Sequence, residues 1–384
     1  MRYDQRWSFY NPVRVVSGPG LINEVASYAP EGGMEKVLLV TSPGSTERGL
    51  AGRLRELLAG RQVTVLDRVS PNPDIASIEQ HRSVLEKENI DFVVGVGGGS
   101  VLDTAKALSF LLGLDDPQFS LREHLAGETP LPESPPLYMI AVPTTAGTGS
   151  EATPFATIWD DCSPKKYSLA HPDLFPDIAL LDPELTLSLP LETTVVTGLD
   201  VLSHALESVW NRNASPLSIS YAARAIDIVL TALPALVERP RNLEKRAMML
   251  AGSYFGGVCI SVTKTALAHS MSYPITASLN VPHGLACSFT LPALLAYNAR
   301  HDDGRLQMAA EMSGCGGISG LSERLEDLFE KIGVGALLEK YKLDAEEALA
   351  LADRMFTPER SCNNICPAGP EEVKAILKAS LPPK

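Results

Sequence analysis

The sequence predicts a two-domain protein, with an α/β domain at residues 1–188 and an all-helical domain at residues 189–384. Length is the first reason, because 384 residues exceed the size at which one hydrophobic core stops growing. Periodicity is the second. Short β-branched runs alternate with helical stretches in the first half, whereas after about Leu189 apolar residues recur every three to four positions.

Five apolar runs are the expected strands of the first domain. Continuous apolar strands separated by helices predict a parallel sheet that is covered on both faces. The Pro-rich segment 130–136 is expected to be a surface loop within this domain. The strand candidates are KVLLVTS (36–42), QVTVLDRV (62–69), DFVVGVGGGS (91–100), YMIAVPTT (138–145) and DIALLDP (177–183).

The second half contains the expected helices, with Pro and Gly at the joints. They cover residues 193–211, 215–238, 244–258, 284–300 and 319–352.

Composition restricts the function classes. Hydrophobic residues make up 45% of the chain and charged residues 21%, which is typical of a folded globular protein. The net charge of −13 argues against nucleic acid or an anionic membrane as partner. No charge-free run approaches the length of a membrane span, and the start lacks a signal-peptide core, so a cytoplasmic location is expected. The six dispersed cysteines are expected to be reduced thiols.

Two glycine-rich segments predict nucleotide binding. Gly97, Gly98, Gly99 and Ser100 follow an apolar strand and precede a helical stretch, the geometry in which backbone N–H groups face a phosphate. A tight structural turn is the alternative for this run alone, and it lacks the G-x-G-x-x-G pattern. The segment 143–150 again follows a strand and is rich in small and hydroxyl residues. Together the two loops suit a pyrophosphate and its riboses.

One aspartate and three histidines in the helical half could bind a metal. Asp200 and His204 are four residues apart, so one helix face presents both. His269 and His283 follow in apolar and small-residue contexts. One carboxylate and three imidazoles can hold a divalent transition metal and leave room for a substrate oxygen. The alternative is a surface Asp/His pair and two unrelated core histidines.

Taken together, these segments resemble the iron-containing (group III) alcohol dehydrogenases, in the same order and with comparable spacing. The similarity runs from the NPVRVVSGPG start to the Asn-Asn segment near the C-terminus. The motifs that support it are GGGSVLDTAK (97–106), PTTAGTGSEAT (143–153), DPELT (182–186), GLDVLSHALES (198–208) and AHSMSYP with PHG (268–274 and 282–284).

The resemblance implies a dehydroquinate synthase-like superfold with an N-terminal dinucleotide-binding domain and a C-terminal helical domain. A divalent metal, Fe²⁺ or alternatively Zn²⁺, would occupy the cleft, and the cofactor would be NAD(H) or NADP(H). A small aldehyde or alcohol substrate and a homodimer are also implied. The implied metal ligands are Asp200, His204, His269 and His283, and the implied cofactor residues are Gly97, Gly98, Gly99, Ser100, Asp103, Thr144, Thr145, Thr148 and Ser150, with Lys106 behind the first loop.

The chain departs from the family pattern at three positions. Many members carry a histidine four residues after the third ligand, near the substrate, where this chain has Tyr273. Tyr273 could pass or position a proton, and the alternative is a buried tyrosine that packs against the cofactor. Lys264 stands where small residues are common and could neutralise an anionic substrate, although a solvated surface lysine is the alternative. Ser42 stands where an aspartate commonly favours NADH, so NADPH becomes permissible.

The resulting hypothesis is a metal-dependent NAD(P)H-linked alcohol dehydrogenase or aldehyde reductase. The stretch around Lys264 and Tyr273 looks most like the branch that includes phosphonoacetaldehyde reductases, which form 2-hydroxyethylphosphonate. Three alternatives remain at this stage: an alcohol dehydrogenase for uncharged short-chain alcohols, a dehydroquinate-synthase-like lyase, and a non-catalytic nucleotide-binding regulator.

Overall fold

The computed structural model describes residues 6–132, 134–163 and 165–381, except for the side chain of Glu359. The chain forms two compact units. Unit 2 comprises residues 11–145 and 150–186, and unit 1 comprises residues 1–10, 146–149 and 187–384. The sequence predicted one boundary after residue 188. The observed division lies close to it, but unit 1 also includes the N-terminal segment and the loop 146–149.

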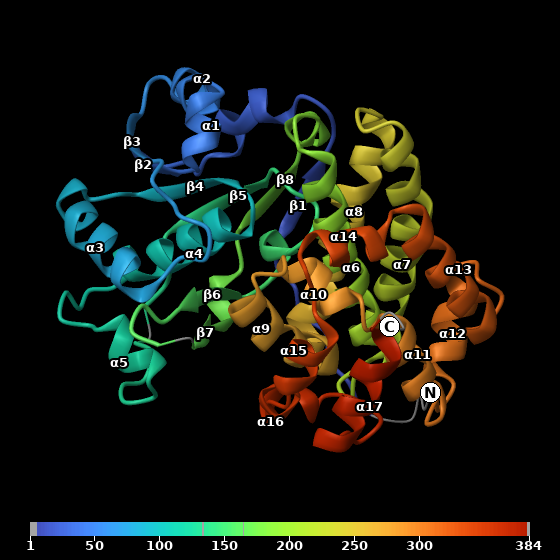
Figure 1. The fold of residues 1–384 in the computed structure, drawn as a ribbon. Helices are drawn as coiled ribbons and strands as arrows, with labels where there is room; N and C mark the ends of the chain where they lie inside the picture. The colour runs from blue at the N-terminus through green and yellow to red at the C-terminus, as the bar shows by residue number, and fades with distance from the viewer. Residues whose placement is uncertain (1–5, 133, 164, 382–384) are drawn as a thin grey trace. The chain divides into compact units, whose positions relative to one another are not determined.

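Unit 2 is built on a six-stranded parallel sheet in the order β1-β8-β5-β4-β2-β3 (Figure 1). Each of the five predicted runs contributes one strand, and the expected parallel α/β sheet is confirmed. The strands are β1 (Arg14–Ser17), β2 (Lys36–Val40), β3 (Gln62–Leu66), β4 (Phe92–Gly97), β5 (Tyr138–Pro143) and β8 (Ile178–Leu181).

The central strands are apolar throughout because both faces of the sheet are covered. In β4, Val93 faces one core cluster, whereas Phe92 and Val94 face the other. Helices α3 (Ile75–Leu85) and α4 (Gly99–Gly113) supply the first cluster, and α2 (Leu50–Leu57) with the 3-10 helix η1 (Leu21–Tyr28) supplies the second. Alternate side chains of a strand point to opposite faces, so each core takes every second residue.

A two-stranded antiparallel sheet in unit 2 was not predicted. It pairs β6 (Phe155–Trp159) with β7 (Lys166–Ala170), which are half-exposed and mix polar with apolar residues. The remaining short elements of unit 2 are α1 (Pro43–Glu47), η2 (Glu86–Glu88), α5 (Leu121–Leu125), η3 (Ser150–Ala152), η4 (Pro172–Leu174) and η5 (Pro183–Thr186).

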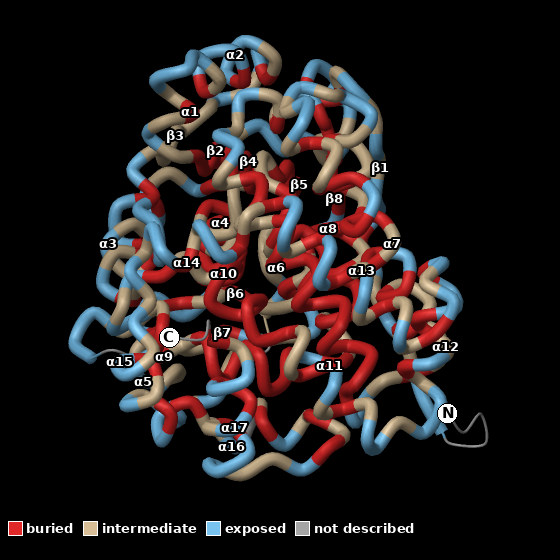
Figure 2. Tube along the Cα trace, turned by 45° about the vertical axis from the view of Figure 1, so that its right-hand side comes forward, coloured by how far each residue is buried: buried red, intermediate tan, exposed pale blue. Residues whose placement is uncertain are grey.

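Unit 1 is helical, as the apolar periodicity predicts. Helix α6 packs against α7, α8 and α10, and α9 packs against α10; Figure 2 shows their buried stretches in red. The helices are α6 (Leu191–Val209), α7 (Pro216–Glu238), α8 (Leu243–Thr263), α9 (Leu267–Leu279), α10 (His283–Ser288), α11 (Leu291–Ala299), α12 (Arg305–Met312), α13 (Ile318–Lys331), α14 (Val334–Lys340), α15 (Ala345–Ala350), η6 (Ala352–Arg354), α16 (Pro358–Ser361) and α17 (Pro370–Ser380).

Helix α7 is long and apolar enough to span a membrane, judged by length and composition alone. It begins with a capping box between Ser215 and Ser218 and with Pro216 in the first turn, the start expected of an ordinary helix. Of its most apolar stretch, 61% is buried inside the protein. Its apolar surface is therefore covered by α6 and α8, and it is a core helix of unit 1.

Candidate active site

Helix α6 places Asp200 and His204 on one face, one turn apart. Both side chains are buried, and Nε2 of His204 lies 3.6 Å from Oδ1 of Asp200. The i, i+4 spacing read from the sequence therefore corresponds to a real contact.

His269 lies in the first turn of α9 and reaches the same aspartate. Its Nε2 atom is 3.5 Å from Oδ1 of Asp200, and its ring stacks on the His204 ring with centroids 4.9 Å apart. Sixty-five positions separate the two imidazoles in the chain, so the packing of unit 1 brings them together. They are not unrelated core histidines.

His283 opens helix α10, and its ring centroid lies 5.3 Å from that of His269. The next residue must be glycine, because a Cβ on Gly284 would lie 2.0 Å from the carbonyl oxygen of Val196 in α6. This backbone-to-backbone contact draws the start of α10 onto α6. One turn after His283, Sγ of Cys287 lies 3.4 Å from Oδ1 of Asp200. Sequence analysis did not single out this thiol.

Three of the four predicted ligand residues, Asp200, His269 and His283, could hold a divalent metal ion, because their ligand atoms and Sγ of Cys287 lie within 4.8 Å of one another. His204 is outside this group, although its Nε2 atom contacts Asp200. Among the described residues, the buried Nε2 atom of His269 has no hydrogen-bond partner, and leaving such an atom unsatisfied is costly. Burial opposes ionisation of Asp200, but His204, His269 and His283 together hold the pKa of its carboxyl below the usual value. Burial also lowers the pKa of His204, so its imidazole is neutral. Burial alone would lower the pKa of His269, but Glu207 and Asp200 raise it above the usual value, so metal binding would displace a proton from this imidazole. A metal binds an ionised carboxylate and neutral imidazoles.

Glu207 is a further residue of this centre, and sequence reasoning missed it. It is fully buried, and its carboxylate accepts backbone N–H bonds from Ala266, Ala268 and His269 at 3.0, 2.5 and 3.2 Å. It also lies 2.6 Å from Nδ1 of His269. Burial opposes ionisation, but interaction with His269 and these hydrogen bonds lower the pKa of Glu207. The ionised carboxylate can only accept, so in the neutral imidazole of His269 Nδ1 carries the proton and Nε2 is the nitrogen that can bind a metal.

Tyr273 lies one turn after His269, because α9 continues through Pro274. Its ring stacks on the His283 ring at 6.2 Å with an interplanar angle of 11°. Burial raises the pKa of Tyr273 to about 12, so its hydroxyl stays protonated at neutral pH. The structure thus places Tyr273 against a predicted metal ligand.

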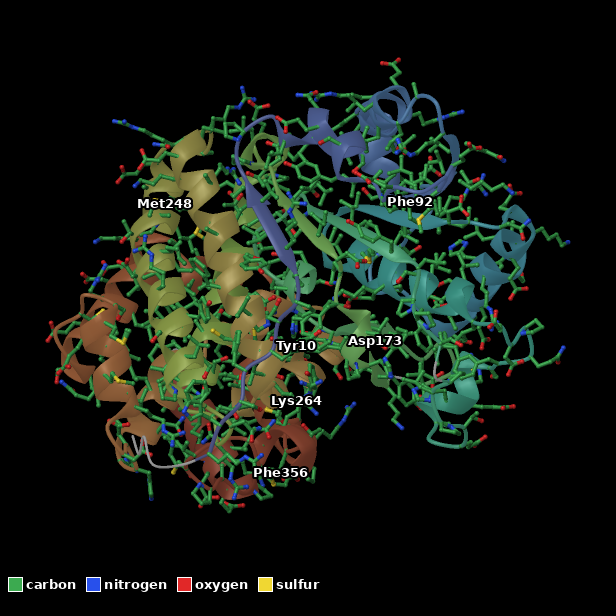
Figure 3. The ribbon with its side chains drawn as sticks, turned by 180° about the vertical axis from the view of Figure 1, so that it is seen from behind. Tyr10, Phe92, Asp173, Met248, Lys264 and Phe356 are labelled. Atoms are coloured by element: carbon green, nitrogen blue, oxygen red, sulfur yellow. The ribbon has the colours of Figure 1, made fainter. Side chains whose placement is uncertain are left out.

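Lys264 lies at the C-terminal end of α8, and Figure 3 labels it. Its side chain is exposed, and its backbone has a positive φ of 60°. The carbonyl of Lys264 accepts a hydrogen bond from Nδ2 of Asn211. These contacts hold the backbone in place and leave the ammonium group in solvent.

In unit 2, Ser42, the first glycine-rich loop and the start of the second, up to Thr145, lie at one edge of the sheet. They directly follow β2, β4 and β5, which are neighbours and parallel, so their carboxyl ends meet at the same edge. The N–H of Thr144 donates to the carbonyl of Gly97 and joins the two loops. Helix α4 begins at Gly99, and its N-terminal N–H groups face this edge.

The other predicted cofactor residues have different environments. The Asp103 carboxylate accepts hydrogen bonds from Oγ of Ser150 at 2.6 Å and from the N–H of Thr157 at 2.9 Å, so it holds the second loop on α4. Thr148 belongs to unit 1, within the loop 146–149. In that loop, a Cβ on Gly149 would lie 2.4 Å from Cα of Gly257 in α8.

Lys106 is buried beneath the first loop and does not reach it. Its Nζ atom donates to Oγ1 of Thr153 and to the carbonyl of Phe155, both at 2.9 Å. Burial lowers the pKa of Lys106 to about 8 and raises that of the neighbouring Glu151 to about 7. The two hydrogen bonds of Lys106 hold the β6 region against α4.

The parallel-sheet unit and the helical unit have the fold of the dehydroquinate synthase-like proteins. A family model described as iron-containing alcohol dehydrogenase matches residues 12–183. The C-terminal model of the same family matches residues 194–381. The chain belongs to the iron-containing alcohol dehydrogenase family and is an oxidoreductase.

Individual relatives cover almost the whole chain. The NAD-dependent methanol dehydrogenase of Bacillus methanolicus is 30% identical, over 97% of this chain and 100% of its own length. The sulfoacetaldehyde reductase of Bilophila wadsworthia is 28% identical, over 97% and 98%. The crystal structure of the sulfoacetaldehyde reductase from Bifidobacterium kashiwanohense in complex with NAD⁺ has a TM-score of 0.90 at 31% identity, over 98% of both chains.

Proposed function

We propose that the protein is a metal-dependent, NAD(P)H-linked reductase of short aldehydes that carry an anionic group. Phosphonoacetaldehyde, reduced to 2-hydroxyethylphosphonate, is the specific substrate proposed. We further propose Fe²⁺ as the metal, with Zn²⁺ as the alternative, and a cytoplasmic homodimer. The observation that carries the reductase proposal is the cluster formed by the buried Asp200, His204 and His269 with the half-buried His283, in which Nε2 of His269 lacks a partner among the described residues.

The chain's own residues prepare the reaction. Glu207 keeps the proton of His269 on Nδ1, so Nε2 is free to bind the metal. When bound, the metal would act as a Lewis acid on the substrate oxygen. In this proposal the Tyr273 hydroxyl, which is protonated at neutral pH and whose ring stacks on His283, donates to the substrate oxygen. The loops after β4 and β5 offer backbone N–H groups to the dinucleotide phosphates.

The two sulfoacetaldehyde reductases support an anionic substrate, because each covers nearly the whole chain. A sulfonate and a phosphonate are both tetrahedral anions, so a pocket for one has much of the chemistry needed for the other. The methanol dehydrogenase relative supports the second candidate, an alcohol dehydrogenase for uncharged short alcohols. Family membership favours both over the lyase and the non-catalytic regulator.

A reductase screen tests the proposal. Protein loaded with Fe²⁺ or Zn²⁺ is assayed with phosphonoacetaldehyde, sulfoacetaldehyde and propionaldehyde, each with NADH and NADPH. We expect stoichiometric oxidation of the reduced cofactor and a higher kcat/KM for the anionic aldehydes. Preference for propionaldehyde would favour the second candidate. No turnover with any aldehyde by protein shown to hold metal would refute the reductase proposal.

A further inference from the structure

Arg360 brings a guanidinium group to the Tyr273 side of the metal-ligand cluster. It lies in helix α16, ninety-one positions after His269, and no sequence pattern singled it out. Its Cζ atom is 5.3 Å from the centroid of the Tyr273 ring, and that ring stacks on His283. One aromatic ring therefore contacts both a cation and a predicted metal ligand.

Hydrogen bonds fix the segment that carries Arg360. Oγ of Ser270, the residue after His269, donates to the carbonyl of Met355 at 2.6 Å, and the N–H of Thr357 donates to Oγ of Ser270 at 2.9 Å. Nδ2 of Asn363 donates to the carbonyl of Thr265 at 2.9 Å. The segment is thus fastened to the start of α9, and Arg360 is held in place relative to His269 and Tyr273.

The Arg360 side chain has unused capacity for an anion. Its Nη1 atom donates to Oγ1 of Thr265. It forms no ion pair with any carboxylate whose side chain the structure describes, although the chain carries a net charge of −13. The side chain is half-buried, so solvent screens it less than it screens a surface arginine. A guanidinium presents five donors in a plane and matches tetrahedral oxyanions in a bidentate manner.

We propose that Arg360 binds the anionic group of the substrate and so determines the preference for aldehydes that carry a phosphonate or sulfonate. This inference rests on the proposed reductase function and names the residue behind its specificity. It assigns to Arg360 the countercharge that the sequence suggested for Lys264. The two residues differ in the structure, because Lys264 is exposed and Arg360 lies over the Tyr273 ring.

The test compares Arg360→Met and Arg360→Lys with two matched variants. Methionine keeps much of the apolar stem and removes the charge. Arg354→Met removes an exposed arginine six positions away and is the control, and Lys264→Met tests the rival assignment. Each variant is assayed with phosphonoacetaldehyde, sulfoacetaldehyde and propionaldehyde. Binding of ethylphosphonate, which has the anion but no aldehyde, is measured by calorimetry.

Arg360→Met is expected to lower kcat/KM for the anionic aldehydes by about tenfold to a hundredfold, mainly through KM. Activity on propionaldehyde should change by less than about fivefold. Ethylphosphonate affinity should fall in parallel, and Arg360→Lys should restore part of it. If kcat/KM falls more for phosphonoacetaldehyde than for sulfoacetaldehyde, Arg360 prefers the phosphonate dianion. The reverse result identifies the sulfonate monoanion as the preferred group.

Three results would overturn the assignment. Equal losses on charged and neutral aldehydes would show that Arg360 supports structure. A loss of activity on the anionic aldehydes in Lys264→Met alone would show that Lys264 supplies the countercharge. Unchanged ethylphosphonate binding in Arg360→Met would show that Arg360 does not contact the anionic group. Failure of the wild-type enzyme on every aldehyde is a different outcome and refutes the reductase proposal itself.

Discussion

The Nδ1 atom of His269 lies 2.6 Å from Oε2 of Glu207, and the same carboxylate accepts three backbone N–H bonds at the start of α9. No side chain within α9 caps this terminus, and Ala266 is the N-cap residue. Glu207 therefore supplies from α6 the cap that α9 lacks. One buried carboxylate orients a predicted metal ligand and stabilises the helix that carries it.

Replacing Glu207 by glutamine should weaken metal binding by about tenfold to a hundredfold, because the amide cannot accept at every donor it faces. Titration of metal-free protein with Co²⁺ against a competing chelator measures this. The Tm of the metal-free variant should also fall as the α9 cap weakens. Glu244→Gln, at an exposed position in α8, is the control. Unchanged Co²⁺ affinity would show that Glu207 serves the helix alone.

His269→Ala should abolish turnover and leave most of the dinucleotide affinity. The reason is that His269 lies in unit 1, whereas most predicted phosphate-binding residues lie in unit 2. Fluorescence titration of folded, metal-free protein with NADH and NADPH measures the affinity. An equal loss of cofactor binding would contradict this division of roles.

Ser42→Asp should depress the use of NADPH more than that of NADH, through repulsion of the 2′-phosphate. Ser42 is the N-cap of α1, and its Oγ accepts from the N–H of Ser45. Aspartate is an equally good N-cap residue, so the fold should be retained. The measurement is the ratio of kcat/KM for the two cofactors. An unchanged ratio would place Ser42 away from the adenosine ribose.

Glu151→Gln should change how stability depends on pH. Burial raises the pKa of Glu151 from 4.5 to about 7, so between these values the folded protein holds a proton that the unfolded chain has released. The folded state therefore loses stability as pH rises through this window, by up to about 3 kcal/mol. Glutamine does not titrate. The Tm of the variant minus that of wild type should therefore increase as pH rises from 4.5 to about 7.

The exposed Glu128→Gln variant is the control for this experiment. A Tm difference between Glu151→Gln and wild type that stays constant across the window would show that the pKa of Glu151 is the same in the folded and unfolded states. The raised pKa would then be wrong.

Sequence patterns predicted those features that depend on residues close together in the chain, such as the buried strands and the helical pair of Asp200 and His204. The central strands are apolar along their whole length because both faces are buried, and this made them visible in the sequence. Asp200 and His204 could be paired because a helix repeats every 3.6 residues. The β6 and β7 strands were missed because they are half-exposed and lack a continuous apolar run.

Residues brought in by tertiary packing could not be predicted in the same way. Arg360 approaches Tyr273 through hydrogen bonds between segments about ninety positions apart, and no local pattern encodes them. Glu207 did carry a signal. It lies seven positions after Asp200 and three after His204, on the same helix face, and a carboxylate on a face flanked by apolar residues needs buried partners.

The geometry of helix α6 restricts the insertions and deletions that the sequence can accept. Asp200, His204 and Glu207 share one face of it, so the gain or loss of a single residue between positions 200 and 207 would turn Glu207 by about 100° relative to Asp200. Natural length variants should therefore be absent from this part of α6, whatever substitutions its outer face accepts.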